Sequence, residues 1–382
     1  MTFYPSSQPI RSSPGRDSET GATVRRRPES CVAATPQRLF QSVYLPPTTD
    51  RGWRLEELLG VSEIRYFSYG RRAFVEALRI AGVGPGDAVA LPGLICRALL
   101  SSLRALDAQP VFYPVGPELT PVLPPAEWPG AKVIVAVNYF GFPQDLVPFQ
   151  QYCIRTGAIL IEDNAHGLLS RDEDGRWLGT RGDIGLFSMR KTLPLSSGAA
   201  LSVSNERFKL GPPQAFGHDR APLSFHMKQA LRRLAPIVGS PNFLRLTRLV
   251  RGMKGMTGLS DWSNPERAES ELPMPALPTR LLAAPLCVDG AQESMRRRAL
   301  YSTVGCLLAD SGLDIRPVFA SWPAQVVPYG YPFYAEDSAL RGIDALFDAV
   351  GLSWSNWPHL PRAIVDSAPR HYKNLRLVHF LW

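Results

Sequence analysis

The sequence predicts an α/β protein, with a mainly parallel sheet in a large domain and a smaller α/β domain at the C-terminal end. Two observations carry this prediction. Short apolar runs such as 133–137 end in turn residues and alternate with segments of helical pattern, as in a parallel sheet with connecting helices. The 382 residues are also enough to build two domains with full cores.

The chain divides into three parts by composition. Residues 1–37 are rich in Ser, Pro, Arg and Thr with little apolar periodicity, so we expect a disordered tail rather than a nucleic-acid-binding arm. Residues 38–280 should form the large domain and include a basic helical segment between about 225 and 253. Residues 281–382 should form the small domain, after a crossing that is rich in Pro and Ala.

Charge and cysteine content narrow the class of protein. The formal net charge of +8 could favour anionic substrates such as nucleotides, or a membrane surface, although the basic helices are best interpreted as solvated faces. No apolar run approaches the length of a membrane span, and no signal-peptide core is present. Five scattered cysteines without a C-x-x-C pair indicate a reducing, cytoplasmic location and no zinc site. We expect no nucleic-acid partner.

The N-terminal half supplies most of the expected sheet. A turn at 67–70 enters a helix that runs to Ile80, and the exposed amides at such a helix start suit a phosphate. Strands are expected at 88–91, 110–113 and 133–137, and a helix at 145–155.

The C-terminal part should hold helices at 291–311 and 338–350 and strands near 315–318 and 331–334. Trp354, Trp357 and His359 could line a substrate pocket, but packing in an aromatic core explains them equally well.

The stretch that organises the chain runs from 158 to 201. An apolar strand ends at Glu162 and Asp163, with His166 three residues beyond. A second apolar run, 184–187, ends at Ser188, and Lys191 follows. Ligands of open α/β sheets bind outside the carboxyl ends of the strands, so an acid, a histidine, a hydroxyl and an amine should meet at one edge.

That set of groups suits pyridoxal phosphate. This cofactor needs a lysine for a Schiff base and an acid to keep its pyridine nitrogen protonated, which Lys191 and Asp163 could supply. Ser188 could bind the phosphate, and His166 could stack on the ring or bond its phenolic oxygen. Each residue also has an ordinary interpretation, as a helix cap, a buried histidine, a turn cap or a surface lysine, but the four together favour the cofactor.

The same motifs resemble the DegT–DnrJ–StrS family of pyridoxal-phosphate aminotransferases. The resemblance covers most of residues 66–203. It rests on the segments E-D-N-A-H at 162–166, G-D-I-G-L-F-S at 182–188 and K-T-L-P at 191–194. The ending at 375–379 also resembles the terminal strand of that family.

The resemblance implies the aspartate-aminotransferase fold (fold type I), with a seven-stranded-type sheet and an active site shared between the subunits of a homodimer. It implies that Gly70, Arg71 and Arg72 hold the cofactor phosphate. Cys96 stands where family members carry a stacking aromatic residue, and Asn138 replaces a common histidine. The asparagine motif that reaches the neighbouring subunit is not found, and the cluster at 217–220 is the nearest polar group.

The implied activity is transamination. Lys191 would carry the cofactor and move a proton, while an amino donor, with glutamate expected, gives its nitrogen to a keto group. The family's typical acceptor is a nucleotide-linked keto sugar in polysaccharide or natural-product biosynthesis. Two alternatives remain open at this point, namely another pyridoxal-phosphate reaction on an amino acid and a non-catalytic binding or regulatory protein on the same fold.

Overall fold

The computed structural model describes residues 48–211, 215–217, 223, 225–227, 230, 266, 277–350 and 352–380. The tail at 1–37 and most of the basic helical segment lie outside the described residues. So does most of the polar cluster at 217–220, of which only Gly217 is described.

A seven-stranded sheet forms the centre of the large domain. Its order is β2-β8-β7-β6-β5-β3-β4, and all neighbours are parallel except β8, which is antiparallel to both β2 and β7. The strands are β2 (Ile64–Phe67), β3 (Ala88–Pro92), β4 (Gln109–Tyr113), β5 (Val133–Val137), β6 (Ile159–Asn164), β7 (Ile184–Phe187) and β8 (Ala199–Val203). The mainly parallel sheet and the α/β class are therefore confirmed.

Helices cover this sheet as the apolar patterns predict. The helix α3 packs against β2, β7 and β8, whereas α5 packs against β5 and β6. The large-domain helices are α2 (Leu55–Leu59), α3 (Gly70–Ile80), α4 (Leu100–Arg104), α5 (Val147–Thr156) and α6 (Met189–Thr192). Strand β5 is buried along its whole length, which explains its unbroken apolar sequence.

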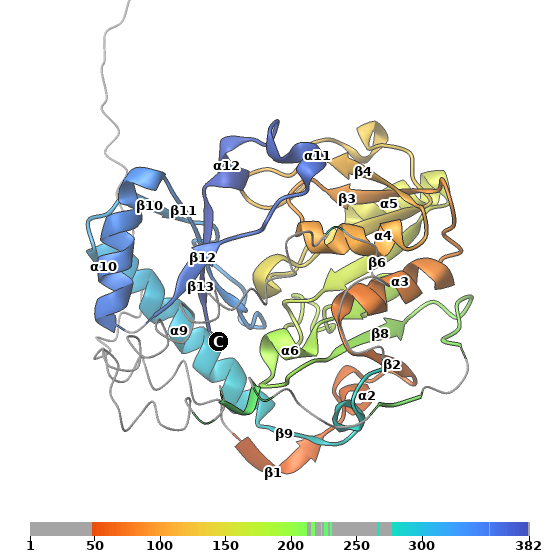
Figure 1. The fold of residues 1–382 in the computed structure, drawn as a ribbon, viewed down its shortest axis with the longest axis horizontal. Coiled ribbons are helices and arrows are strands. Elements are labelled where there is room, and N and C mark those ends of the chain that lie inside the picture. Colours follow the sequence, from red (N-terminus) through yellow and green to blue (C-terminus); the bar gives the residue numbers. More distant parts are fainter. Residues whose placement is uncertain are drawn as a thin grey trace, which may run out of the picture.

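The C-terminal part forms a four-stranded antiparallel sheet with the order β10-β11-β13-β12. Its strands are β10 (Ile315–Pro317), β11 (Gly330–Ala335), β12 (Trp354–Asn356) and β13 (Leu375–His379), and its helices are α9 (Gly290–Asp310), α10 (Leu340–Val350), α11 (Arg362–Val365) and α12 (Arg370–Lys373). Figure 1 shows this sheet, flanked by α9 and α10, beside the large domain. The domain boundary at residue 280 stays a prediction.

One pairing joins distant parts of the chain. Strand β1 (Thr48–Trp53) pairs antiparallel with β9 (Leu286–Val288), at the lower edge of Figure 1. The indole nitrogen of Trp53 also donates to the carbonyl of Val288 at 2.7 Å. The start of the described chain is thus tied to the segment that leads into α9.

The two sheets share one apolar core. Its buried side chains include Phe74 of α3, Phe149 of α5, Phe333 of β11 and Phe347 of α10. Polar contacts add to it, because the hydroxyl of Tyr372 accepts from the amide of Val115 at 2.9 Å. The small sheet is therefore packed firmly against the large domain.

Two further observations bear on the cell biology expected from the sequence. No helix in the described part of the chain has the length and apolarity that a membrane crossing requires. Among the described cysteines, Cys96, Cys153 and Cys287 are free thiols.

Candidate active site

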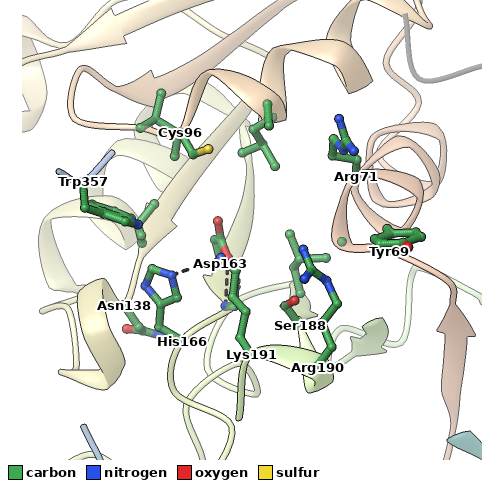
Figure 2. Close-up of a pocket in the computed structure, with 17 residues that line it drawn as sticks. Tyr69, Arg71, Cys96, Asn138, Asp163, His166, Ser188, Arg190, Lys191 and Trp357 are labelled. Carbon is green, nitrogen blue, oxygen red and sulfur yellow. Dashed lines mark hydrogen bonds between the residues drawn. The ribbon is translucent and has the colours of Figure 1, made fainter. Parts of the chain in front are cut away.

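A cavity of about 220 Å³ opens at the carboxyl edge of the large sheet. Six residues that the sequence analysis assigned to the cofactor line this cavity, namely Gly70, Arg71, Asp163, His166, Ser188 and Lys191. Figure 2 shows Asp163 and Lys191 in the middle, His166 and Trp357 on one side, and Ser188, Arg190, Arg71 and Tyr69 on the other.

Strand direction explains why these side chains meet. Strands β2, β6 and β7 run parallel within the sheet, so the residues that follow them emerge at the same edge. Asp163 is the penultimate residue of β6, and Ser188 directly follows β7. Gly70 opens α3 shortly after β2.

Arg72 is the exception among the predicted residues, because it does not line the cavity. Consecutive side chains on a helix point in directions about 100° apart, so a helix that turns Arg71 inward turns Arg72 away. The second arginine that lines the cavity is Arg190, which the sequence analysis did not select. Its guanidinium lies 5.3 Å from the centre of the Tyr69 ring.

Asp163 is a buried carboxyl group that faces the cavity. Burial raises its pKa, and the nearby Lys191 amine offsets part of this effect. Its carboxylate accepts the backbone N–H of Ala165 at 2.9 Å. A cation placed in the cavity beside this group would stabilise its charged form.

The preceding residue, Glu162, is directed into a different environment. Its carboxylate accepts from the side chain of Arg181 at 2.6 and 2.8 Å, from the backbone N–H of Arg181 at 2.8 Å and from Asn138 at 2.8 Å. The Oδ1 atom of Asn138 accepts from the side chain of Arg181 at 2.9 Å. The backbone N–H of Asn138 donates to the carbonyl of Asp163 at 3.0 Å. Asn138 therefore belongs to the buried network that holds the end of β6.

His166 stacks on two aromatic rings. The Tyr329 ring is 4.5 Å away at an interplanar angle of 6°, and the Phe140 ring is 5.6 Å away at 10°. Trp357 meets the imidazole edge-on at 5.4 Å. The imidazole therefore stacks on both rings, and its role toward a cofactor stays a prediction.

The hydrogen bonds of His166 define its tautomer. The backbone N–H of Phe140 donates to Nδ1 at 3.2 Å, so the proton of the neutral ring resides on Nε2. That Nε2 atom lies 3.0 Å from Nζ of Lys191. A protonated lysine has no lone pair to accept this bond, so the arrangement favours a neutral amine.

The electrostatic environment points the same way. Burial lowers the pKa of Lys191, and the Arg190 charge adds to this, while Asp163 and Cys96 act in the opposite direction. Burial also brings the pKa of His166 well below its usual range, and Lys191 contributes to that shift. A lysine with a lowered pKa in a cavity is an amine prepared for nucleophilic attack.

The small domain also contributes to the cavity. Trp357, which follows β12, is among the lining residues, whereas Trp354 and His359 are not. Trp357 is one of the three residues that the sequence analysis proposed for a substrate pocket. Cys96 lines the cavity as a free thiol.

Comparison with known proteins agrees with these motifs. Residues 53–207 match the model of the DegT/DnrJ/EryC1/StrS aminotransferase family. The match covers these residues and leaves the rest of the chain outside it. The resemblance drawn from the motifs is thereby confirmed, and all the cavity residues except Trp357 fall within the matched range.

Two curated relatives illustrate the match. L-glutamine:2-deoxy-scyllo-inosose aminotransferase of Streptomyces kanamyceticus is 33% identical over 174 residues, which is 42% of this chain and 40% of that protein. The dTDP-4-dehydro-2,3,6-trideoxy-D-glucose 4-aminotransferase of Saccharopolyspora spinosa is 31% identical over 136 residues, which is 34% of this chain and 35% of that protein. The matches thus span well under half the length of these relatives.

Solved structures agree with the fold over a larger part of the chain. The aminotransferase TlmJ of Streptoalloteichus hindustanus has a TM-score of 0.52 at 20% identity, with 91% of this chain and 86% of that chain covered. A DegT DnrJ EryC1 StrS aminotransferase of Brucella abortus has a TM-score of 0.55 at 16% identity, with 86% and 83% covered. The predicted α/β fold is therefore shared with these proteins over most of the chain.

Proposed function

We propose that this chain is an aminotransferase that uses pyridoxal phosphate to move an amino group from an amino acid to a keto sugar. The observation that carries the proposal is the position of the Lys191 amine, which lies in the cavity with Asp163. It is within hydrogen-bond distance of His166, whose tautomer favours the neutral form of the lysine. The two relatives named above act on cyclic or nucleotide-linked keto sugars by their names, which suggests the same class of acceptor here.

The donor set of the cavity fits this cofactor. Asp163 would hold the pyridine nitrogen, because a buried carboxylate gains from an adjacent cation. The first turn of α3 at Gly70 and Arg71 would bind the phosphate together with Ser188 and Arg190. A Cβ at position 70 would meet no atom within 4 Å, so the space beside the start of α3 is open. Lys191 would attach to the aldehyde.

The residues of the chain then have separate roles in the reaction. The bound cofactor supplies the electron sink that makes the α-carbon of the donor acidic. Lys191 takes the proton from that carbon and returns it, which requires the free amine. His166 donates its Nε2 proton to an acceptor at the lysine end, and Phe140 keeps that proton on Nε2. The rings of Phe140, Tyr329 and Trp357 pack against the imidazole and would hold it in this position.

The direct test is covalent trapping. Purified protein is incubated with pyridoxal phosphate, its visible absorbance is recorded, and the adduct is reduced with borohydride and located by peptide mass spectrometry. We expect the label on Lys191 and no label in Lys191→Ala. The exposed Lys209 provides the matched control, since Lys209→Ala should load normally. Amine transfer is then assayed with glutamate or glutamine as donor and a panel of keto sugars.

A protein that takes up no pyridoxal phosphate would refute the proposal and leave a binding protein built on the aminotransferase fold. Uptake with label on Lys191, but transfer only between amino acids and keto acids, would retain the cofactor and exclude the sugar acceptor. A homodimer is part of the proposal as well, and sedimentation analysis of the full chain tests it.

A further inference from the structure

The helix α9 carries a buried cation that reaches the lysine segment. Arg297 is 1% exposed, and its Nε donates to Glu293 Oε1 at 2.6 Å. Its Nη1 donates to the carbonyls of Pro328 and Tyr329 at 3.2 and 3.1 Å, and its Nη2 donates to the carbonyl of Thr192 at 3.1 Å. The guanidinium therefore joins α9, the loop before β11 and the end of α6.

These contacts converge on the reacting amine from two directions. Thr192 is the residue directly after Lys191, so one contact fixes the backbone that carries the amine. Tyr329 is the residue whose ring lies 4.5 Å from His166, so another contact fixes the packing of the imidazole. His166 in turn bonds Lys191 at 3.0 Å.

We propose that Arg297 is a positioning residue for Lys191, which holds the amine and the imidazole at hydrogen-bond distance by anchoring both supporting segments to α9. This inference rests on the proposed role of Lys191 as the reacting amine. Only the planar guanidinium, with donors in a fixed fork, can serve these three carbonyls and Glu293 together. A lysine would keep the charge but lose the fork.

The neighbouring Arg296 supplies a matched control. It also binds Glu293, at 2.7 Å, and its Nη2 atom reaches the carbonyl of Phe380 at 3.3 Å. The cavity lining and the hydrogen bonds of Thr192 and Tyr329 do not involve it. Arg296→Lys therefore perturbs the same ion pair without touching the supports of Lys191.

The charged and titratable groups that act on Lys191 are Asp163 of β6, Cys96 of the β3 loop, Arg190 of α6 and His166. Arg297→Lys changes none of them and keeps the net charge. A change in the reactivity of Lys191 in this variant would therefore report its geometry.

The experiment is competitive acetylation with acetic anhydride as a function of pH, read by peptide mass spectrometry. The chain contains only six lysines, and the exposed Lys209 is the internal reference in every sample. In Arg297→Lys we expect the midpoint for Lys191 to move up by about 1 pH unit, because the bond that favours the neutral amine is lost. Arg296→Lys should keep the wild-type midpoint.

A second variant tests the other arm and covers a failure of Arg297→Lys to fold. Tyr329→Leu removes the ring beside His166 but keeps the carbonyl that Arg297 binds, and it should shift the midpoint in the same direction. Equal midpoints in wild type, Arg297→Lys and Tyr329→Leu would overturn the inference and leave Arg297 a purely structural residue, as would an equal shift in Arg296→Lys.

Loading with pyridoxal phosphate is measured on portions of the same preparations that have not been acetylated. A shifted midpoint in a protein that never binds the cofactor would retain the positioning role and refute the proposed function. Normal loading with an unshifted midpoint would retain the proposed function and refute the positioning role of Arg297. The two proposals are therefore separable.

Discussion

Replacing Glu162 by glutamine should strongly destabilise the protein. The carboxylate is fully buried and accepts from the Arg181 side chain, the N–H groups of Arg181 and Gly182, and the side chain of Asn138. A glutamine has one acceptor oxygen and one donor amide, so at least two of these donors would face another donor. Arg181, only 5% exposed, would lose its closest counter-ion.

The expected loss of unfolding free energy is about 3 to 5 kcal/mol, which is the usual effect of removing the charge of one partner in a buried ion pair. That is a large part of the roughly 5 to 15 kcal/mol that stabilises a folded domain. Urea denaturation followed by tryptophan fluorescence measures it, with the midpoint moving and the slope unchanged.

Asp174→Asn is the matched control, because Asp174 pairs with Arg176 at 3.1 Å while both side chains are exposed. Its loss should stay below about 1 kcal/mol. The reasoning is refuted if the two variants are destabilised to the same small extent, because the buried network would then contribute no more than a surface pair.

Three further predictions follow from single sites. Gly185→Ala should cost about 3 kcal/mol or more, since the added Cβ would lie 1.7 Å from the carbonyl oxygen of Gly179, whereas Gly84→Ala meets no atom within 4 Å and should melt like wild type. Asp163→Asn should weaken pyridoxal phosphate binding roughly 30-fold by spectroscopic titration, the equivalent of about 2 kcal/mol for a charged hydrogen bond, and unchanged affinity would exclude the ring-nitrogen role. Burial holds the pKa of His166 below 6.5, so the unfolded state binds more protons and stability should fall as the pH drops through and below 6.5. His166→Gln should flatten that slope in thermal melts between pH 7 and 5, and an equally steep slope in the variant would assign the pH dependence to other groups.

Much of the fold and site follows from local sequence. Apolar runs placed the central strands, and the terminal strand Leu375–His379 matches its prediction residue for residue. The polar groups after 162 and 187 meet in one cavity because parallel strands end at the same edge. The meeting of these groups was predictable because the residues that follow parallel strands emerge at the same edge of the sheet.

Other features depend on contacts between residues far apart in sequence. The pairing of β1 with β9 joins residues 48–53 to 286–288, and neither segment has the apolar alternation that announces a strand. Arg190 and Tyr69 line the cavity because the start of α3 and α6 lie close together, which no local pattern reports. The family motif suggested Arg71 and Arg72 together, and of the two only Arg71 is among the residues that line the cavity.

The acidic pair at the end of β6 illustrates how the sheet separates structure from chemistry. Successive side chains of a strand point to opposite faces, so Glu162 and Asp163 cannot serve the same environment. On one face of β6, the side-chain amide of Asn138 donates to both Glu162 and Asn164. The buried ion pair between Glu162 and Arg181 holds the strand on the same face. The other side presents Asp163 to the cavity. The backbone of Asn138 also binds the carbonyl of Asp163, so the network on one face determines where the carboxylate stands on the other. A defect in the Glu162 network should therefore reach the cavity through the position of Asp163 as well as through stability.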